Sequence, residues 1–298
     1  MISMPTSATQ LVAPILLTVT VLSLWVESRA AWPVFLTLTF LAGYAAGQLT
    51  WLAGLWILQL AGACYAYANE LPHSSKWLVG SVKALGLAGI IILSLGMGLH
   101  ALPGFHNIHA LSAARLSSRS IPYDQWIDFD KTVAGVLVLG IVYRRLIKDT
   151  SRWVAALRRA AIPTVVTIVL VVLLSTAFGY VQWEPKWTSQ FWLWAAINLL
   201  ATCMSEEAFF RAFILAEIER LLARRPAGAI VAIASSSLLF GIAHMAGGWQ
   251  YVTLAVVAGA GYGTVFYRSR SVEGSILAHF ALNAVHFLLF TYPAAVPR

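Results

Sequence analysis

The sequence predicts an all-α fold, a polytopic transmembrane helix bundle of about eight to ten spans. Three observations lead to this prediction. Of the 298 residues, 59% are hydrophobic and only 11% are charged, whereas soluble domains average about 25% charged residues. Apolar runs long enough to cross a bilayer recur from one end of the chain to the other. The twelve Trp and ten Tyr residues suit the aromatic belts of membrane–water interfaces.

The expected spans are apolar runs at residues 9–26, 31–48, 50–68, 77–102, 131–145, 161–181, 190–219, 228–245, 250–267 and 275–292. The run at 131–145 is short for a span. The run at 190–219 exceeds the roughly 20 residues that cross the hydrocarbon core, so we expect its continuation from Glu217 to Arg225 to emerge into the interface. The N-terminus has no cationic start and no small-residue cleavage site, which favours a retained first span over a cleaved signal.

Lys and Arg residues gather in the links 144–159 and 220–225 and at Arg268 and Arg270. If the runs between them alternate, these links share one side, which the positive-inside rule makes cytoplasmic. The net charge of +8 is attributed to this topology, and no nucleic-acid partner is expected. The sequence therefore predicts an integral multi-pass membrane protein with the lipid bilayer as its surroundings, and we expect this membrane to be a bacterial inner membrane. It indicates no oligomeric state.

A boundary is expected in the basic link near residue 160, which separates two groups of five runs. Residues 1–160 form an N-terminal transmembrane region of unknown role, and residues 161–292 hold the candidate site. The long polar link 103–130 is expected outside, either as a functional loop or as a cap on the bundle. Cys64 and Cys203 lie in apolar runs, so we expect no disulfide framework. Cys203 is interpreted as a packing residue, with a nucleophilic role as the alternative.

Two adjacent carboxylates, Glu206 and Glu207, lie inside the apolar run 190–219. Ionisable residues are costly in a span and mark functional sites by default. Arg211 follows Glu207 by four residues, so the two side chains can pair along one helix face. Glu206 then has no local partner and is free to face a cavity. The alternative is a buried ion pair with one stray carboxylate near the membrane surface.

Two further pairs have the i, i+4 spacing of a single helix face. Phe240 precedes His244, and His279 precedes Asn283. Taken alone, a histidine such as His244 at a helix end more often has a structural role. The polar face of His279 and Asn283 can likewise serve only to form hydrogen bonds between helices. A Glu, two His and an Asn on three helices can instead converge in a bundle core. Such a set supplies a base for water and donors for a developing oxyanion in a dry surround.

These motifs resemble a known family. The pattern Glu-Glu-x-x-x-Arg, then Phe-x-x-x-His, then His-x-x-x-Asn is similar to that of the CAAX prenyl endoprotease and bacteriocin-processing family, also called CPBP or ABI proteins. The chain carries all three elements in order, as Glu206-Glu207/Arg211, Phe240/His244 and His279/Asn283. The resemblance covers about residues 161–292.

The resemblance implies an intramembrane glutamate endopeptidase with its catalytic cavity in the C-terminal half and no cofactor. Glu206 would be the general base, and His244 would orient and activate the water. His279 and Asn283 would form the oxyanion hole. The remaining motif residues would support the site, namely Glu207, Arg211 and Phe240. The implied partner is a membrane-anchored protein or peptide substrate, such as a CAAX-type peptide, a C-terminal sorting signal or a bacteriocin precursor.

The predicted span boundaries conflict with a single site that contains Glu206, His244 and His279. Counted along straight spans, Glu206 lies in mid-membrane, His244 near the outer end of its span and His279 near the inner end of its own. Tilted or broken helices would be needed to bring them together. Glycines at 241, 247 and 248 suit a break near His244.

Three other activities fit parts of this pattern. A zinc metalloprotease could use two His and one Glu as ligands, although the His-Glu-x-x-His spacing is absent. A rhomboid-like serine protease could use Ser275 close to His279. A transporter or a non-enzymatic scaffold could use buried Glu, His and Arg side chains as a proton relay.

Overall fold

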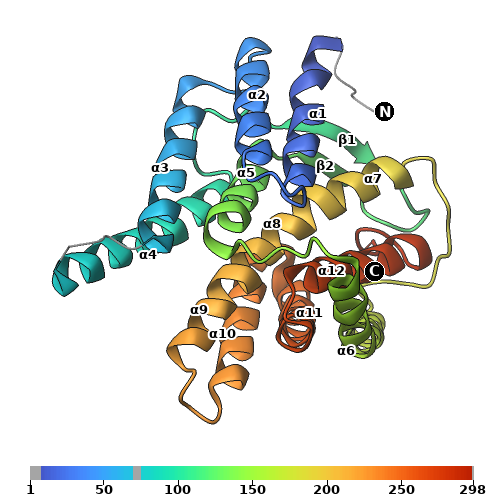
Figure 1. Cartoon of the computed structure of the whole chain (residues 1–298). Coiled ribbons are helices and arrows are strands. Elements are labelled where there is room, and N and C mark those ends of the chain that lie inside the picture. The colour runs from blue at the N-terminus through green and yellow to red at the C-terminus, as the bar shows by residue number, and fades with distance from the viewer. Residues whose placement is uncertain (1–7, 70–74, 297–298) are drawn as a thin grey trace.

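The computed structural model describes residues 8–69 and 75–296 and is dominated by helices (Figure 1). The all-helical polytopic prediction is confirmed. In the N-terminal half the helices are α1 (Ala8–Ser23), α2 (Ala31–Ala45), α3 (Trp51–Ala68), α4 (Lys76–Gly98) and α5 (Phe129–Leu137), which continues as the π-helix η1 (Val138–Tyr143). In the C-terminal half they are α6 (Thr150–Ala177), α10 (Gly228–Ala243), α11 (Gly248–Ser269), α12 (Val272–Leu289) and one long helix described below.

The long helix runs without interruption from Phe191 to Leu221, in place of the predicted run 190–219. It alternates between α and π geometry, as α7 (Phe191–Ile197), η2 (Asn198–Cys203), α8 (Met204–Glu207), η3 (Ala208–Leu215) and α9 (Ala216–Leu221). The two adjacent carboxylates therefore end a four-residue α segment held between two π segments. Such π segments occur often at functional sites.

Not all helices of the bundle are parallel. In Figure 1, α6 and α11 are seen end-on, whereas α1, α2 and α10 lie in the plane of the view. The pair α10 and α11 is bent by 58° at the short 3₁₀ turn η4 (Met245–Gly247). Gly248 begins α11 with a φ of +82°, a backbone conformation that favours glycine.

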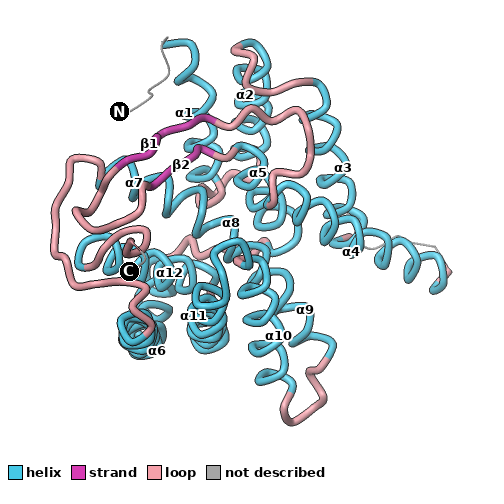
Figure 2. The backbone as a smooth tube through the Cα atoms, turned by 180° about the vertical axis from the view of Figure 1, so that it is seen from behind, coloured by secondary structure: helices cyan, strands magenta, loops and turns pink. Residues whose placement is uncertain are grey.

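A β-hairpin occupies much of the link that the sequence predicts as a long polar segment. Strand β1 (Ile108–Ala114) pairs antiparallel with β2 (Tyr123–Ile127), and the register shifts twice along the ladder (Figure 2). His109 and Trp126 stack their rings at 4.0 Å, and His109 also pairs with Asp124. β2 leads directly into α5, so the hairpin fixes the start of that helix.

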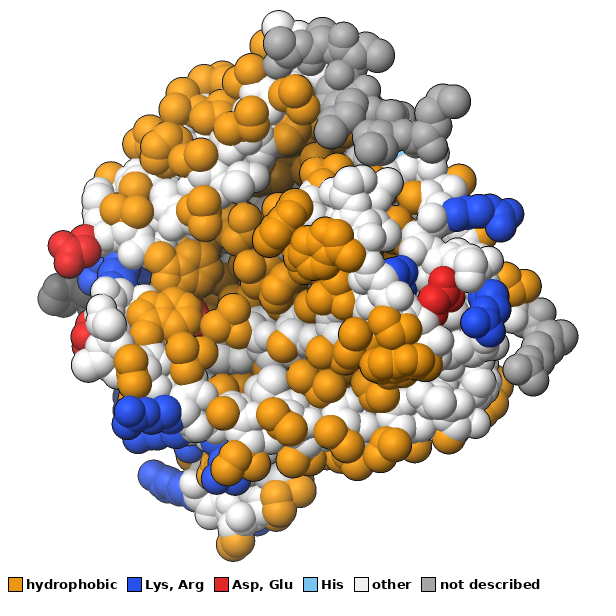
Figure 3. All heavy atoms as spheres, turned by 90° about the vertical axis from the view of Figure 1, so that its right-hand side faces the viewer, with side chains coloured by type: hydrophobic (Ala, Val, Ile, Leu, Met, Phe, Trp, Pro, Cys, Tyr) orange, Lys and Arg blue, Asp and Glu red, His pale blue; other side chains and the backbone are white. Residues whose placement is uncertain are grey.

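Several helices have the length and apolar surface of membrane spans. Among the described residues, α3, α4, α6 and α12 each meet both criteria, and the bent pair α10–α11 would make a fifth span. The outer face of α6 exposes only large aliphatic side chains over three turns, at Ile162, Val165, Val166, Val169, Leu170 and Leu173. Figure 3 shows one side of the molecule with many hydrophobic side chains across its middle, whereas Lys and Arg lie towards its edges, at the lower left and at the right. The other predicted runs form helices that are shorter, bent or partly π-helical.

The two halves of the chain share a hydrophobic core. Its largest cluster includes Leu60 and Leu139 from the N-terminal half, and Phe213 and Ile276 from the C-terminal half. Figure 1 shows α5 beside α8 in the centre of the molecule, where these elements are in contact. The N-terminal region thus packs directly against the helix that carries the Glu pair.

Candidate active site

Glu206 lies between the two histidines of the motifs. Its Oε2 atom is 3.9 Å from Nε2 of His244 and 3.9 Å from Nε2 of His279. The structure therefore brings together three residues that straight spans would separate in depth. Two features make this possible: α10 ends at Ala243, one residue before His244, and the helices cross at steep angles.

The orientation of His244 is fixed by its own helix. Its Nδ1 atom lies 2.7 Å from the carbonyl oxygen of Phe240. A carbonyl oxygen can only accept, so Nδ1 carries the proton and the Nε2 lone pair of a neutral His244 faces Glu206. The 3.9 Å gap between the two acceptors exceeds a direct hydrogen bond, and a water molecule can bridge such a gap.

His279 is held by Glu207 and Tyr262. Its Nδ1 atom donates to Glu207 Oε1 at 2.9 Å. The imidazole stacks on the Tyr262 ring, with centroids 4.5 Å apart and planes 18° apart. These contacts direct Nε2 of His279 towards Glu206.

Glu207 and Arg211 form the ion pair that their spacing predicts. Arg211 Nη1 donates to Glu207 Oε1 at 3.1 Å, and both side chains are fully buried. Arg211 Nη2 also donates to the carbonyl oxygen of Gly259 at 3.2 Å, and the guanidinium lies 4.4 Å from the Phe240 ring centre. The Ser275 hydroxyl donates to the second oxygen of Glu207. Glu207 is therefore a buried anchor for three helices, and its oxygens do not face the cavity.

Lys131 is a site residue that the motifs do not reveal. Its Nζ atom donates to Glu206 Oε1 at 2.6 Å, and both side chains are largely buried. The prediction for Glu206 concerned only partners on its own helix, and this ion-pair partner comes from α5, 75 residues earlier in the chain. The sequence signal was a lone cation at the start of an apolar run, and such cations usually have a partner.

A close approach of two backbones allows this contact. Gly135 lies one turn after Lys131 on α5, and a Cβ atom there would lie 2.7 Å from Cα of Ser205. Real Cβ atoms essentially never come that near another carbon. Glycine at this position therefore lets α5 touch α8 and brings Lys131 within reach of Glu206.

Asn283 lines the same cavity as Glu206 but contacts different residues. Its amide nitrogen donates to Asn198 Oδ1 at 3.1 Å and lies 3.7 Å from Cys203 Sγ. The Cys203 thiol donates to the same Asn198 oxygen at 3.3 Å. The structure thus does not join Asn283 to the Glu206 and His279 group by a hydrogen bond among the described residues. Cys203 is fully buried, in agreement with a packing role.

Two cavities meet at Glu206 and His244, which line both. One cavity, of about 380 Å³, also contains His279 and Asn283 together with several tyrosines. The other, of about 260 Å³, is mainly apolar and extends to Leu95 and Leu99 at the end of α4. Lys131 lines only the apolar cavity. An elongated molecule could therefore reach Glu206 from two directions.

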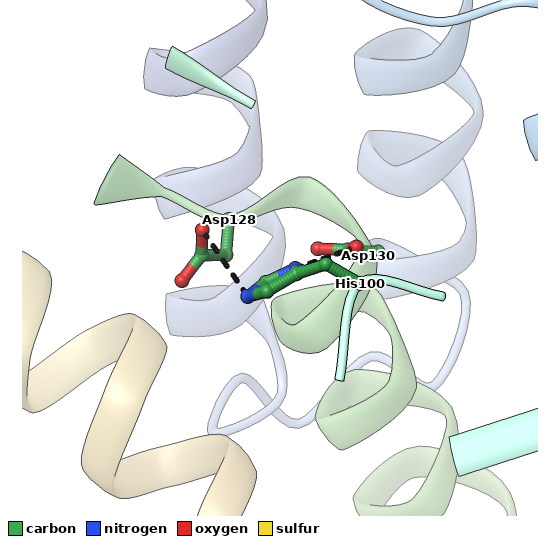
Figure 4. A group of neighbouring side chains, drawn as sticks. All are labelled: His100, Asp128 and Asp130. Carbon is green, nitrogen blue, oxygen red and sulfur yellow. Dashed lines mark hydrogen bonds and ion pairs between the residues drawn. The ribbon is translucent and has the colours of Figure 1, made fainter. Parts of the chain in front are cut away.

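A second group of charged side chains, His100, Asp128 and Asp130, lies at the start of α5 next to Lys131. His100 lies between Asp128 and Asp130 (Figure 4), with its Nδ1 atom 2.8 Å from Asp130 Oδ2 and its Nε2 atom 3.9 Å from Asp128 Oδ1. The hydrogen bond with Asp130 raises the pKa of His100 above 6.5. Asp130 Oδ1 accepts from the backbone N–H of Lys131 and from Asn107. The group thus fixes the first turn of α5.

The same three side chains are of types that bind metals. Within the described residues, His100, Asp128 and Asp130 form a group whose potential ligand atoms all lie within 4.8 Å of one another. Glu206, His244 and His279 do not form such a group. Ser275, the candidate serine nucleophile, is fully buried against Glu207.

Comparison with known proteins agrees with the motifs. A family model described as Rce1-like, type II CAAX prenyl endopeptidase, matches residues 187–285. No curated protein and no solved structure matches the chain. The matched segment contains every motif residue, whereas Lys131 lies outside it. The match confirms the predicted resemblance to the CPBP family of CAAX-type proteases, over residues 187–285.

Proposed function

We propose that the protein is an intramembrane glutamate endopeptidase that hydrolyses a peptide bond in a membrane-anchored protein or peptide. One observation carries this proposal: a carboxylate oxygen of the largely buried Glu206 faces the Nε2 atoms of two histidines across gaps of 3.9 Å. This geometry fits a water molecule that is held by two acceptors and loses a proton to one of them.

The reaction begins with this water. Glu206 Oε2 takes one of its protons while His244 Nε2 accepts a hydrogen bond from the other, and the water oxygen forms a bond to the substrate carbonyl carbon. The carbonyl oxygen becomes an oxyanion, for which Asn283 and His279 are the proposed donors. His279 can donate from Nε2 when both ring nitrogens carry protons, because Nδ1–H is given to Glu207. The C–N bond then breaks, and Glu206 passes its proton to the leaving nitrogen.

The supporting residues hold the proposed catalytic side chains in position. Lys131 holds Glu206 Oε1 and leaves Oε2 free to face the water. Glu207 orients His279, while Arg211 and Phe240 hold Glu207 and His244 in place. The donation by Asn283 requires its amide to leave Asn198, a movement that substrate binding would drive.

The zinc alternative fits the donor set less well. Zinc would use Glu206, His244 and His279, whose ligand atoms are not gathered into a compact group. The Lys131 ammonium already neutralises Glu206 at 2.6 Å, so a divalent cation there would meet a positive charge at close range. A proton-relay transporter would use the same buried charges and is separated from the protease by experiment.

The two cavities favour an elongated, membrane-associated substrate. The apolar cavity near α4 suits an apolar side chain or a lipid group, and the larger cavity suits the polar backbone near the scissile bond. A C-terminal sorting signal, a lipidated C-terminal peptide and a bacteriocin precursor all have this character. We place the reaction in the bacterial inner membrane, and we assign it to residues 161–292 together with Lys131 from the N-terminal region.

The test is co-expression of wild type or Glu206→Gln with candidate membrane-anchored substrates, followed by mass spectrometry of the products. Glu219→Gln is the matched control, because Glu219 lies on the same long helix in an ion pair with Arg270. Cleavage by wild type and the control, with one ¹⁸O atom from labelled water in the new C-terminus, supports the proposal. Unchanged products from Glu206→Gln would refute it. Loss of activity on chelation with recovery on adding zinc would favour the metalloprotease.

A further inference from the structure

A cavity of about 310 Å³ is lined only by residues of the N-terminal half, between Leu24 and Lys148, and contains none of the motif residues. It lies at one end of several helices. It is formed where α1 ends, where α2 begins and where η1 ends, with one wall from the last turn of α3. The link from Arg144 to Lys148 closes it. This link belongs to the most basic segment of the chain, so the cavity opens on the side that the positive-inside rule makes cytoplasmic.

The charge of this cavity is entirely positive. Its lining includes Arg29, Arg144 and Lys148 and no acidic residue. In the described part of the chain, none of the three has a carboxylate in ion-pair distance. Lys148 Nζ donates to the carbonyl oxygen of Val26, which holds the ammonium at the rim without neutralising it.

Two carboxylates next to the link that closes the cavity accept hydrogen bonds from other groups. Glu273 accepts from the Trp25 indole and from the backbone N–H of Ile147. Asp149 caps the start of α6 by accepting from Ser151. These hydrogen bonds hold both carboxylates away from the cations of the cavity: neither residue lines it, and neither forms an ion pair with Arg29, Arg144 or Lys148.

The rest of the lining is aromatic and aliphatic. Trp32 lies against η1 so closely that a Cβ atom on Gly140 would be 2.7 Å from its ring. Tyr65 also lines the cavity, together with the aliphatic side chains of Leu24, Leu139, Ile141 and Leu146. Trp and Tyr suit the headgroup level of a bilayer, whereas a site for a free anion has no need of aliphatic walls.

We propose that this cavity binds the phosphate group of an anionic membrane lipid. The cations would contact the phosphate oxygens, with bidentate geometry open to the two guanidinium groups, and the Trp32 and Leu walls would contact the glycerol and upper acyl carbons. Basic pockets between transmembrane helices on the cytoplasmic side bind anionic headgroups in this way. The lipid would tie together α1, α2, α3 and η1, which continues the helix that carries Lys131. The inference does not depend on the proposed protease activity.

The test uses the full-length protein in a nonionic detergent with dioleoyl phosphatidylglycerol, and native mass spectrometry counts the bound lipid. The pocket variant is Arg29→Gln/Arg144→Gln/Lys148→Gln. The matched control is Arg224→Gln/Arg225→Gln/Arg268→Gln, which removes the same charge from exposed positions outside the cavity. At about fivefold per lost cation, the pocket variant should bind on the order of 100-fold more weakly, and the control should remain within about threefold of wild type.

Three further measurements keep the proposal open to refutation: a single variant, a zwitterionic lipid and inorganic phosphate. Arg29→Gln alone is in an exposed link, so it should fold normally and still weaken binding about fivefold. Equal weakening in the pocket and control variants would mean diffuse attraction and would overturn the proposal. Dioleoyl phosphatidylcholine binding as tightly as phosphatidylglycerol would also overturn it. Inorganic phosphate that displaces the lipid at equal concentration would show a free-anion site in place of a lipid site.

Discussion

Replacing Lys131 by Met tests the contact between the two halves of the chain most directly. The substitution keeps most of the side-chain volume and removes the ammonium that lies 2.6 Å from Glu206 Oε1. Glu206 then remains in a largely buried position with no cation beside it. The expected results are a less stable protein and a slower reaction, because Oε1 is no longer held and the orientation of the base is lost.

The size of the effect follows from the geometry. Two unit charges at 2.6 Å attract each other by about 6 kcal/mol at an effective dielectric constant of about 20. Desolvation offsets part of this, and removing one partner of a buried pair costs about 3–5 kcal/mol. The lower end applies here because Glu206 lines two cavities. We therefore expect Lys131→Met to lose about 3 kcal/mol of unfolding free energy, with kcat reduced on the order of 10-fold to 100-fold.

A double-mutant cycle in a denaturant titration measures the pair itself. Glu206→Gln alone leaves Lys131 buried and unpaired, so it should also cost about 3 kcal/mol. The double variant should cost clearly less than the sum, with a coupling energy of at least about 2 kcal/mol. Lys131→Arg should retain most of the stability, and Lys76→Met at the exposed start of α4 should change little. Additivity within about 0.5 kcal/mol would refute the ion pair as a stabilising contact.

Three further predictions follow from the same geometry. Gly135→Ala should destabilise the protein by about 1–3 kcal/mol and reduce proteolysis, because the new Cβ atom would lie 2.7 Å from Cα of Ser205. Gly62→Ala, at an open position, is the control. Equal thermal unfolding midpoints for the two variants would contradict the close approach of α5 and α8. His100→Gln should lower the free energy of unfolding most below pH 6.5, the ordinary pKa of His. The stability difference from wild type should vanish as pH rises through the raised pKa of folded His100. Because His100 is 46% exposed, this difference should stay within about 1 kcal/mol, and a difference that grows with pH would contradict the prediction. Asn283→Ala should lower kcat on the order of 100-fold with little change in KM, and a loss below about threefold in a steady-state assay would remove Asn283 from the oxyanion hole.

The sequence singles out the motif residues because their signals are local. The i, i+4 spacing of Glu207 and Arg211 specifies a pair within one helix, and the structure contains that pair at 3.1 Å. Polar side chains in apolar runs identify Glu206, His244 and His279 in the same way. Such signals need only helical periodicity, which a single sequence displays.

Contacts between distant segments have no such signal. No spacing relates residue 131 to residue 206, and the approach depends on Gly135, one of 21 glycines in the chain. The depth estimate for His244 treated α10 and α11 as straight full spans, whereas the helix ends at Ala243 and the chain turns by 58°. The β-hairpin escaped prediction because its strands are short and irregular, with two register shifts in the ladder.

The position of Lys131 gives the N-terminal region a chemical reason to be present. The family match begins at residue 187 and contains all the motif residues, yet the carboxylate proposed as the base is paired with a lysine from α5. The start of α5 is fixed by Asp130, Asn107 and His100, and its end continues into η1, which lines the basic cavity. A change in either support would move Lys131 relative to Glu206. The N-terminal helices are therefore better understood as part of the candidate site than as a separate membrane anchor.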